Sequence, residues 1–546
     1  MLRCRLYQSE NSIALPRIRL HPPPVCVHSY GARNSCIEYN QTAKIMYDGQ
    51  EELDNLVWDK NDEDSEKSQK EMQLKARCLL VERLASQKFG QTATLVPPLI
   101  MGGFHMLYRI RFEESSPDVM VRLPCPDLVL YPDEKIIHEM ATAKYVAENT
   151  RIPIPKHFFH GRDDSVGPFI ILQHVKNCGS LSARLTTPSG DPNEPHVLNP
   201  GIEEATLEGL WIRVARCYLQ LAQLKFPRIG SFVEADDGSY DVAGRPITHN
   251  MGDMVRLANI PRALLPPMGK TYATADDWYV ALAEMHVAQL VFQHNDAVAS
   301  EDDCRNKYVA RQIFRRLAKQ GRLSTFGFAE DDWSAQSSKR EFSALAPGPC
   351  GSDSFRLWGD DFRAGNILLD DADDIAAVID WEFAYAAPTQ FALDPPWWLL
   401  LNPAETWAAG MEDWRQTYEV RLETWLSAVK RVEERLEGSG PFPIALSTYT
   451  RESWDTGRFW LSYAARKSWA FDAVYWRYLD ERFFGERGSS VSQDQLWRSR
   501  VHLLTQAERG GMEPFVERKM RESEERIIVD WDPIEAQRRL SEVLCT

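Results

Sequence analysis

The hydrophobic pattern divides the chain into three zones. Residues 1–66 have no regular apolar period and end in an acidic run at 59–66, which predicts an irregular, disordered N-terminal tail. Residues 67–90 carry apolar positions at helical spacing, which predicts an amphipathic helix at the start of the second zone. The second zone continues to residue 175 and the third begins at residue 176, and the two differ in the spacing of their apolar positions.

Short apolar runs separated by turns fill residues 91–175, and longer helical periods dominate after residue 176. Alternation at 119–124 and the apolar run at 169–175 indicate strands. The segments 207–224, 278–292 and 304–323 have the apolar period of long helices. The pattern predicts an α+β protein with a small sheet domain over 67–175 and a large, mostly helical domain over 176–546.

One acidic turn lies between two short apolar runs in the helical zone. The runs 367–369 and 375–379 flank the polar segment 370–374, which predicts a tight β-hairpin. A hairpin brings its outer ends together, so Asn366 and Asp380 are expected to lie close enough to share one metal ion. The alternative is an ordinary surface hairpin with acidic flanks.

Asp361 completes the pattern, because it lies five residues before Asn366. The protein kinase catalytic loop has the same spacing between its catalytic Asp and its metal-binding Asn, which selects Asp361 rather than Asp360. Phosphoryl transfer needs a carboxylate to orient the attacking hydroxyl and oxygen ligands to hold Mg²⁺ against the phosphates. The joint match of Asp361, Asn366 and Asp380 favours a catalytic site over the surface hairpin.

The segment LWGDDFRAGNILLD, followed by VIDWEF, resembles the aminoglycoside phosphotransferase-like family, the small-molecule branch of the protein-kinase-like fold. It is most similar to the large fungal group, in which the leading His of the loop is commonly absent; here Gly359 stands at that position. The resemblance implies a two-lobed fold that uses ATP or GTP with Mg²⁺. It also implies that Asp361 is the catalytic base and that Asn366 and Asp380 are metal ligands.

The same resemblance assigns roles in the predicted N-lobe sheet. Gly102 and Gly103 precede a strand and would let backbone N–H groups approach phosphates, although a glycine pair there also fits a plain hairpin turn. Arg122 aligns with the strand lysine that binds phosphates in kinases, and Glu139 aligns with the helix glutamate that pairs with it. The alternatives are a strand Arg that faces solvent and a solvated helix Glu.

A nucleotide base would contact the segment that joins the two lobes. The last N-lobe strand runs into Gln173, His174 and Val175, and the resemblance implies that their backbone groups bond the adenine ring. Because backbone makes these contacts, the side chains do not separate ATP from GTP.

Composition narrows the class of partner. The chain has 546 residues and a net charge of −16, which argues against nucleic-acid binding. No apolar run approaches the length of a membrane span. Ten scattered cysteines without a C-x-x-C pair favour a reducing compartment, and we expect a cytoplasmic protein. The alternative is organelle targeting, for which the four arginines among the first 20 residues are a weak signal.

These observations predict a kinase that transfers the γ-phosphoryl group of a nucleotide, ATP before GTP, to a hydroxyl of a small molecule. One alternative is a catalytically inactive nucleotide-binding or scaffold protein of the same fold, which Gly359 and Arg122 favour. Another is a protein kinase, which is disfavoured because no A-P-E segment follows Asp380. The sequence does not select the acceptor.

Overall fold

A computed structural model gives the fold of the chain. It describes residues 39–41, 53–113, 116–187, 196–339, 344–349, 354–436, 440–488 and 491–545. All of these residues belong to one compact unit that spans 37–546. Most of the predicted N-terminal tail lies outside the described residues. Within them, no helix is both long and apolar enough to cross a membrane.

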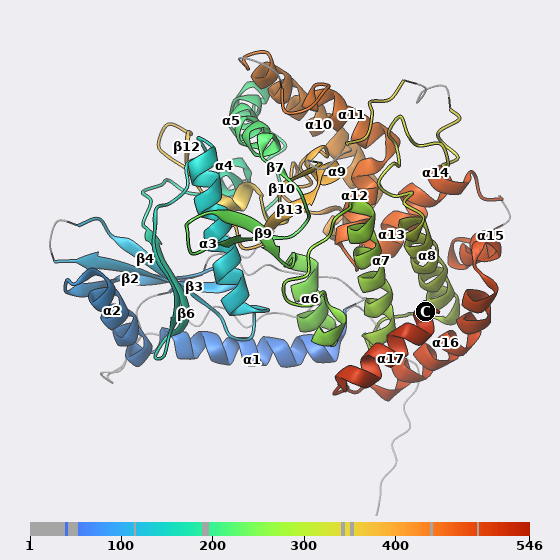
Figure 1. Cartoon of the computed structure of the whole chain (residues 1–546), viewed down its shortest axis with the longest axis horizontal. Helices are drawn as coiled ribbons and strands as arrows, with labels where there is room; N and C mark the ends of the chain where they lie inside the picture. The colour runs from blue at the N-terminus through green and yellow to red at the C-terminus, as the bar shows by residue number, and fades with distance from the viewer. Residues whose placement is uncertain are drawn as a thin grey trace, which may run out of the picture. The chain divides into compact units, whose positions relative to one another are not determined.

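The N-terminal lobe is built on a six-stranded sheet with the order β1-β2-β3-β4-β6-β5 (Figure 1). Its neighbours pair antiparallel except for β1, which runs parallel to β2. The strands are β1 (Tyr39–Gln41), β2 (Ala93–Met101), β3 (His105–Phe112), β4 (Val119–Pro124), β5 (His157–Asp163) and β6 (Gly167–Gln173). Helix α3 (Pro132–Asn149) connects β4 to β5.

Helices make up most of the second lobe, together with three small sheets. The main helices are α5 (Glu204–Gln223), α6 (His249–Ala258), α7 (Ala275–Phe292), α8 (Glu301–Lys319), α10 (Met411–Glu433), α11 (Leu446–Thr456), α12 (Arg458–Arg466), α16 (Gln506–Glu525) and α17 (Pro533–Leu544). The small sheets are β13 (Ala384–Pro388) with β10 (Phe355–Gly359) and β7 (Lys225–Phe226), the hairpin β11 (Ile367–Leu369) with β12 (Ile375–Val378), and the hairpin β8 (Ser231–Glu234) with β9 (Tyr240–Gly244).

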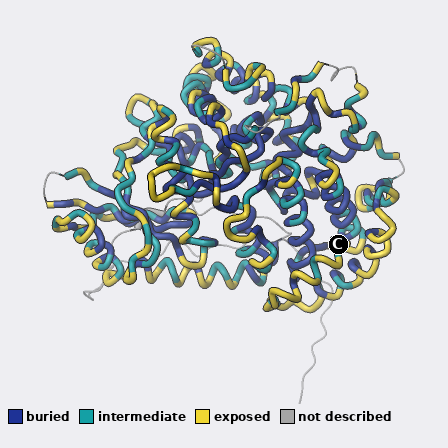
Figure 2. Tube along the Cα trace, in the orientation of Figure 1, coloured by how far each residue is buried: buried dark blue, intermediate teal, exposed yellow. Residues whose placement is uncertain are grey.

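Each lobe has its own hydrophobic core. One cluster joins the sheet residues Tyr108, Val121 and Ile171 to helix α2 (Lys75–Phe89). A second and larger cluster runs through the helices after residue 176 and also takes in one side of α3. Buried positions accordingly fill the interior of both lobes (Figure 2). The prediction of a two-lobed α+β fold is confirmed, and the three predicted helices correspond to α5, α7 and α8.

The predicted N-terminal boundary at residue 66 is wrong. Helix α1 (Asn55–Gln73) begins within the segment predicted to be irregular, and the predicted helix over 67–90 is split at Leu74, whose backbone is extended. Asp54 caps α1, because its side chain accepts from the N–H of Val57 at 3.0 Å. The acidic run belongs to the exposed face of α1, which buries only a few side chains and therefore has a faint apolar period.

Helix α1 bridges the two lobes (Figure 1). At its start, Asp54 accepts two hydrogen bonds from the Asn295 side chain at 3.0 and 3.1 Å. In its middle, Asn61 donates to the carbonyl of Arg256 in α6. Near its end, the Tyr108 hydroxyl of β3 donates to the carbonyl of Met72 at 2.7 Å. The helix therefore links the sheet to α6 and to the end of α7.

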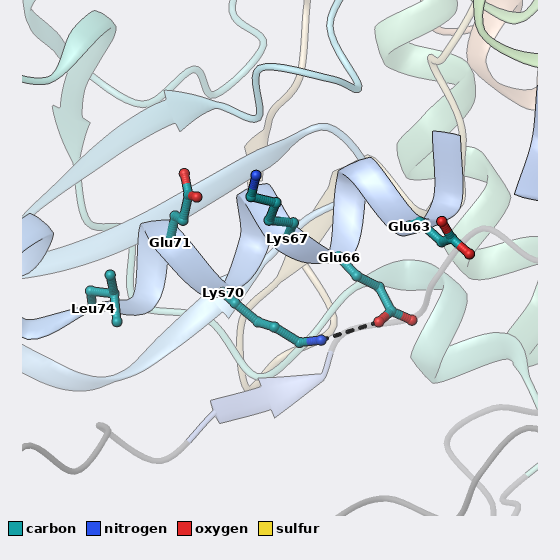
Figure 3. Close-up of a pocket in the computed structure, with 6 residues that line it drawn as sticks. All are labelled: Glu63, Glu66, Lys67, Lys70, Glu71 and Leu74. Carbon is teal, nitrogen blue, oxygen red and sulfur yellow. Dashed lines mark hydrogen bonds and ion pairs between the residues drawn. The ribbon is translucent and has the colours of Figure 1, made fainter. Parts of the chain in front are cut away.

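A shallow hollow lies along the exposed side of α1 (Figure 3). Five charged side chains and Leu74 line it, and Lys70 pairs with Glu66 at 3.2 Å. None of the predicted site residues is among them. The hollow is a solvated helix face and is separate from the site described below.

The capping carboxylate gives a first prediction. Replacing Asp54 with Ala removes the α1 cap and two hydrogen bonds of the buried Asn295 side chain, so the free energy of unfolding should fall by about 1–3 kcal/mol. Urea denaturation measures this change. Asp64→Ala on the exposed face of the same helix is the matched control and should change stability by less than about 0.5 kcal/mol. Equal effects of the two substitutions would contradict the bridging role of α1.

Candidate active site

The β11–β12 hairpin brings the two predicted metal ligands together. Ile367 pairs with Val378, and the N–H of Ile379 donates to the carbonyl of Asn366 at 3.0 Å. Asn366 and Asp380 therefore lie at the open end of the hairpin, as the sequence predicts. Asp380 has a positive φ of 68°, which turns the chain sharply as it leaves β12.

Asp361 lies beside Asn366 in the loop that precedes β11. The Asn366 Nδ2 donates to the Asp361 carboxylate and to the Asp361 carbonyl, each at 2.9 Å. The Arg363 Nε donates to the other carboxylate oxygen at 2.5 Å. Asp360 instead accepts from the Trp358 indole at 2.8 Å and lies 3.6 Å from Arg466. These contacts hold the loop against its surroundings. Asp361, and not Asp360, is therefore the residue that is hydrogen-bonded to Asn366.

Arg122 is buried at the junction of the two lobes and does not face solvent. Its guanidinium pairs with Glu139 of α3 and, at 2.6 Å, with Asp380. A third contact joins it to the His105 Nδ1 at 3.0 Å. Burial alone would lower the pKa of Arg122, but the charges of Asp380 and Glu139 outweigh burial and raise it. The predicted Arg122–Glu139 pair is present, and it is joined directly to the predicted metal ligand.

A second buried ion pair lies beside the first and was not predicted. Lys135 of α3 lies 2.5 Å from Glu382, which follows Asp380 by two residues. Burial raises the pKa of Glu382, and the attraction of Lys135 acts against this shift. The Lys135 ammonium also lies 3.9 Å from the centre of the Phe383 ring. The VIDWEF motif marked the position of Glu382, but nothing in the sequence connected it to Lys135.

His105 completes the cluster as a neutral acceptor. Burial, followed by the charges of Arg122 and Lys135, lowers its pKa well below the usual value. A neutral imidazole can accept at Nδ1 from Arg122 while its other nitrogen lies 3.5 Å from Glu382. His105 therefore joins the two buried ion pairs.

The predicted glycine pair lies in the turn between β2 and β3. The N–H of Gly102 donates to the carbonyl of His105 at 2.8 Å, so this donor is used within the turn. The next residue after the pair, Phe104, packs on Phe383 with ring centres 5.4 Å apart. The turn therefore lies next to the segment that carries Asp380, as a phosphate-covering loop requires.

The predicted base-binding segment begins at the last residue of β6, and part of its backbone is already hydrogen-bonded within the protein. The N–H of Gln173 donates to the backbone carbonyl of Lys156 at 2.8 Å, and the N–H of His174 donates to the backbone carbonyl of Asp118 at 3.2 Å. The Val175 carbonyl accepts from the Asn177 side chain at 3.0 Å. Two of the three N–H groups thus already have partners, which leaves the Val175 N–H as the donor that a nucleotide base would use.

Helix α3 is fixed from the side opposite the sheet by the β8–β9 hairpin. Arg245 holds Glu134 through two bonds of 2.6 and 3.0 Å, and Lys144 pairs with Glu234 at 2.7 Å. At Gly244 a Cβ would lie only 2.4 Å from the His138 ring, so glycine is needed for this close approach. The position of Glu139 is therefore set by packing.

The donor set at the hairpin end fits Mg²⁺ better than a softer metal. Mg²⁺ takes oxygen ligands and in nucleotide sites is held by one or two side chains together with phosphate oxygens. Asn366 and Asp380 supply an amide and a carboxylate, and Asp380 keeps a quarter of its side chain exposed beside Arg122. In the described part of the chain, this site included, no group of three or more His, Cys, Asp or Glu side chains is arranged to hold a metal.

Comparisons with known proteins give structural neighbours of one kind. No family model matches the chain, and no curated protein matches it in sequence. A solved structure described as an aminoglycoside phosphotransferase from Ralstonia eutropha JMP134 is 11% identical, covers 82% of this chain and 97% of its own, and has a TM-score of 0.37.

Two further structures are similar at the same level. A thermostable mutant of the aminoglycoside phosphotransferase APH(4)-Ia, in ternary complex with AMP-PNP and hygromycin B, is 16% identical over 80% of this chain and 98% of its own, with a TM-score of 0.35. The GDP complex of an aminoglycoside 2'-phosphotransferase mutant is 11% identical over 82% of this chain and 100% of its own, with a TM-score of 0.35. At these scores the likeness carries no inference about activity.

The buried Lys135–Glu382 pair gives a prediction that is independent of any ligand. Lys135→Met leaves the Glu382 carboxyl buried without its closest cation and should lower the free energy of unfolding by about 3–5 kcal/mol. Adding Glu382→Gln should restore part of the loss, because no carboxylate then needs a partner. A double-mutant cycle by urea denaturation measures the coupling.

The same helix offers the control for this cycle. Lys144→Met breaks the half-exposed pair with Glu234 and should cost less than about 1 kcal/mol. If Lys135→Met costs no more than Lys144→Met, the buried pair does not stabilise the lobe junction.

Proposed function

We propose that the protein is a small-molecule phosphotransferase that transfers the γ-phosphoryl group of a nucleotide to a hydroxyl group. The observation that supports this most strongly is the double pairing of Arg122 with Glu139 and Asp380. This pairing brings β4 of the sheet, α3 and the end of the β11–β12 hairpin together. Asn366 lies at the same end of the hairpin and is hydrogen-bonded to Asp361. A surface hairpin with acidic flanks does not require such a buried arrangement.

In the proposed reaction, Asp361 orients the acceptor hydroxyl and takes its proton. The bond between the γ-phosphorus and its bridging oxygen breaks, a bond to the acceptor oxygen forms, and the nucleoside diphosphate leaves. Asn366 and Arg363 hold the Asp361 carboxylate in place through bonds of 2.9 and 2.5 Å. The protein supplies orientation and charge, which are the main needs of phosphoryl transfer.

Asn366 and Asp380 would hold Mg²⁺ through their side-chain oxygens. When bound, the metal would neutralise charge on the phosphate oxygens. Arg122 already binds one Asp380 oxygen at 2.6 Å, so we assign it the role of positioning this ligand before any role in phosphate contact. Gly102 and Gly103 would cover the phosphates, and the base would lie against the segment from Gln173 to Val175.

The inactive alternative is weakened by the surroundings of Gly359. A Cβ at this position would lie 3.0 Å from the Phe362 Cβ, so the loop has little room for any side chain there. The Asn366 side chain nevertheless donates to both the carbonyl and the carboxylate of Asp361. The loop is therefore built around glycine and retains its polar geometry without a histidine at position 359.

The acceptor belongs to the class of small molecules with a free hydroxyl group. The net charge of −16 is compatible with a cationic acceptor but does not select one.

Nucleotide binding is the first test of the proposal. Wild type should bind MgATP or MgGTP by calorimetry, and Asp380→Asn should weaken magnesium-dependent binding by about tenfold or more, because a carboxylate ligand is lost. Asp371→Asn, in the exposed turn of the same hairpin, is the matched control and should bind as wild type does. Failure of wild type to bind either nucleotide would rule out the proposed function.

Turnover separates an active enzyme from an inactive binding protein. Asp361→Ala should abolish phosphate transfer to any acceptor found in a metabolite and antibiotic panel, while nucleotide affinity stays within about threefold of wild type, since the proton acceptor is removed and the metal ligands remain. Coupled detection of the released diphosphate measures the rate. Turnover that persists in Asp361→Ala would remove this residue from the mechanism.

A further inference from the structure

A histidine from a different part of the chain lies at the candidate active site. His249 is the first residue of α6, and its ring lies 5.6 Å from Phe104 and 5.2 Å from Phe383, between ring centres. Phe104 belongs to the turn that would cover the phosphates, and Phe383 follows the segment that carries Asp380. His249 therefore lies against both the predicted phosphate-covering turn and the segment that follows Asp380.

One nitrogen of the ring is fixed and the other is available. The Nδ1 of His249 bonds the Asp253 carboxylate at 2.8 Å, one helical turn further along α6. No partner for Nε2 occurs among the described residues, and about a quarter (24%) of the side chain is exposed. Asp253 thus fixes the ring plane and leaves Nε2 as the donor for a bound group.

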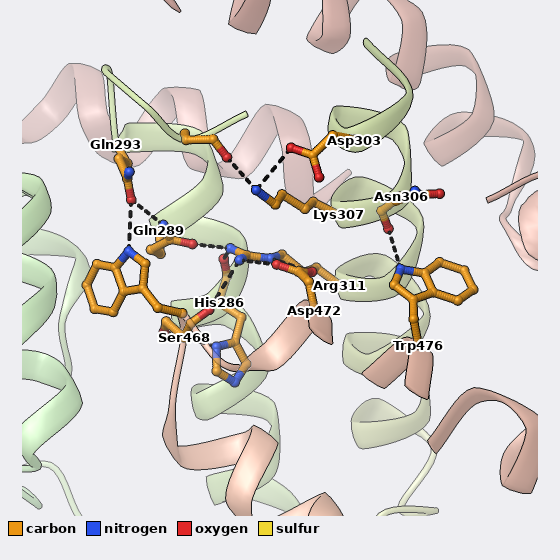
Figure 4. Close-up of polar contacts among 12 residues, drawn as sticks. His286, Gln289, Gln293, Asp303, Asn306, Lys307, Arg311, Ser468, Asp472 and Trp476 are labelled. Atoms are coloured by element: carbon orange, nitrogen blue, oxygen red, sulfur yellow. Dashed lines mark hydrogen bonds and ion pairs between the residues drawn. The ribbon is translucent and has the colours of Figure 1, made fainter. Parts of the chain in front are cut away.

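The first turn of α6 is held rigidly from behind. Asn250, next to His249, bonds the Ser468 hydroxyl at 3.0 Å and accepts from the Ser468 N–H at 2.9 Å. Ser468 belongs to a buried polar network with His286 of α7 and Arg311 of α8, and Arg311 also pairs with Asp472 at 2.7 Å (Figure 4). The network therefore fixes the position of the first turn of α6, which carries His249.

Charged groups on the surrounding elements favour the protonated ring. Burial acts to lower the pKa of His249, but the charges of Asp253 and then of Asp361 outweigh it and raise the pKa, against a smaller opposing effect of Arg256. Lys135 of α3 lies 5.0 and 3.9 Å from the centres of the same two phenyl rings and adds a positive charge nearby.

We infer that His249, held by Asp253, contacts the terminal phosphate of the nucleotide and is a further residue of the proposed reaction. Its Nε2–H would donate a charge-assisted hydrogen bond to an oxygen of the group in transfer, between the Phe104 turn and Asp361. The contact requires the third phosphate, so a nucleoside diphosphate would not make it. This inference rests on the proposed function and assigns a residue that no sequence motif marked.

The test compares two magnesium-bound nucleotides, AMP-PNP and ADP, by calorimetry on the full chain. Wild type should bind AMP-PNP more tightly than ADP, and His249→Gln should lose about tenfold of this preference while ADP affinity is unchanged. His160→Gln, an exposed histidine of β5, is the matched control and should keep the wild-type preference. An undiminished preference in His249→Gln would overturn the inference.

A pH series keeps the inference testable even if His249→Gln does not fold. In wild type the preference for AMP-PNP should fall as pH rises through the raised pKa of His249, because the ring loses its charge. Asp253→Asn should move this fall to lower pH, whereas a pH response identical to that of wild type would count against the contact. If wild type binds neither nucleotide, the proposed function fails, and this outcome is distinct from failure of the inference alone.

Discussion

The junction between the lobes depends on one buried guanidinium. Arg122 has only 8% of its side chain exposed, and an unpaired charge at such a depth would cost several kcal/mol. Glu139 and Asp380 therefore have to come together around it, although the second lies 258 residues further along the chain. This requirement fixes β4, α3 and the end of the β11–β12 hairpin relative to one another, and thereby sets the geometry of the site.

Packing on α3 makes this geometry independent of a ligand. The sheet side of the helix carries Glu139 and Lys135 into the two buried ion pairs, while the Arg245–Glu134 bonds hold the opposite side against the β8–β9 hairpin. The glycine contact at His138 allows no larger residue between them. A nucleotide would therefore meet a preformed set of charges and would lose little binding energy in ordering it.

The sequence predicted what is encoded locally. Asp361, Asn366 and Asp380 lie within twenty residues, and a hairpin alone brings two of them together, so spacing was sufficient. Arg122 and Glu139 needed the family resemblance, because no local rule pairs a strand with a later helix. The contacts of Lys135 with Glu382 and of His249 with Phe104 and Phe383 arise only from tertiary packing. Helix α1 was placed too late because its surface is mostly charged and its apolar period is faint.

The charges at the junction suggest how the site would receive a metal-bound nucleotide. Glu139, Asp380 and Glu382 pair with Arg122 and Lys135, so three carboxylates meet two cations, and the excess negative charge of the ionised cluster favours an incoming cation. Arg122 holds one oxygen of Asp380, so this candidate metal ligand is also part of the buried pair on which the lobe junction depends.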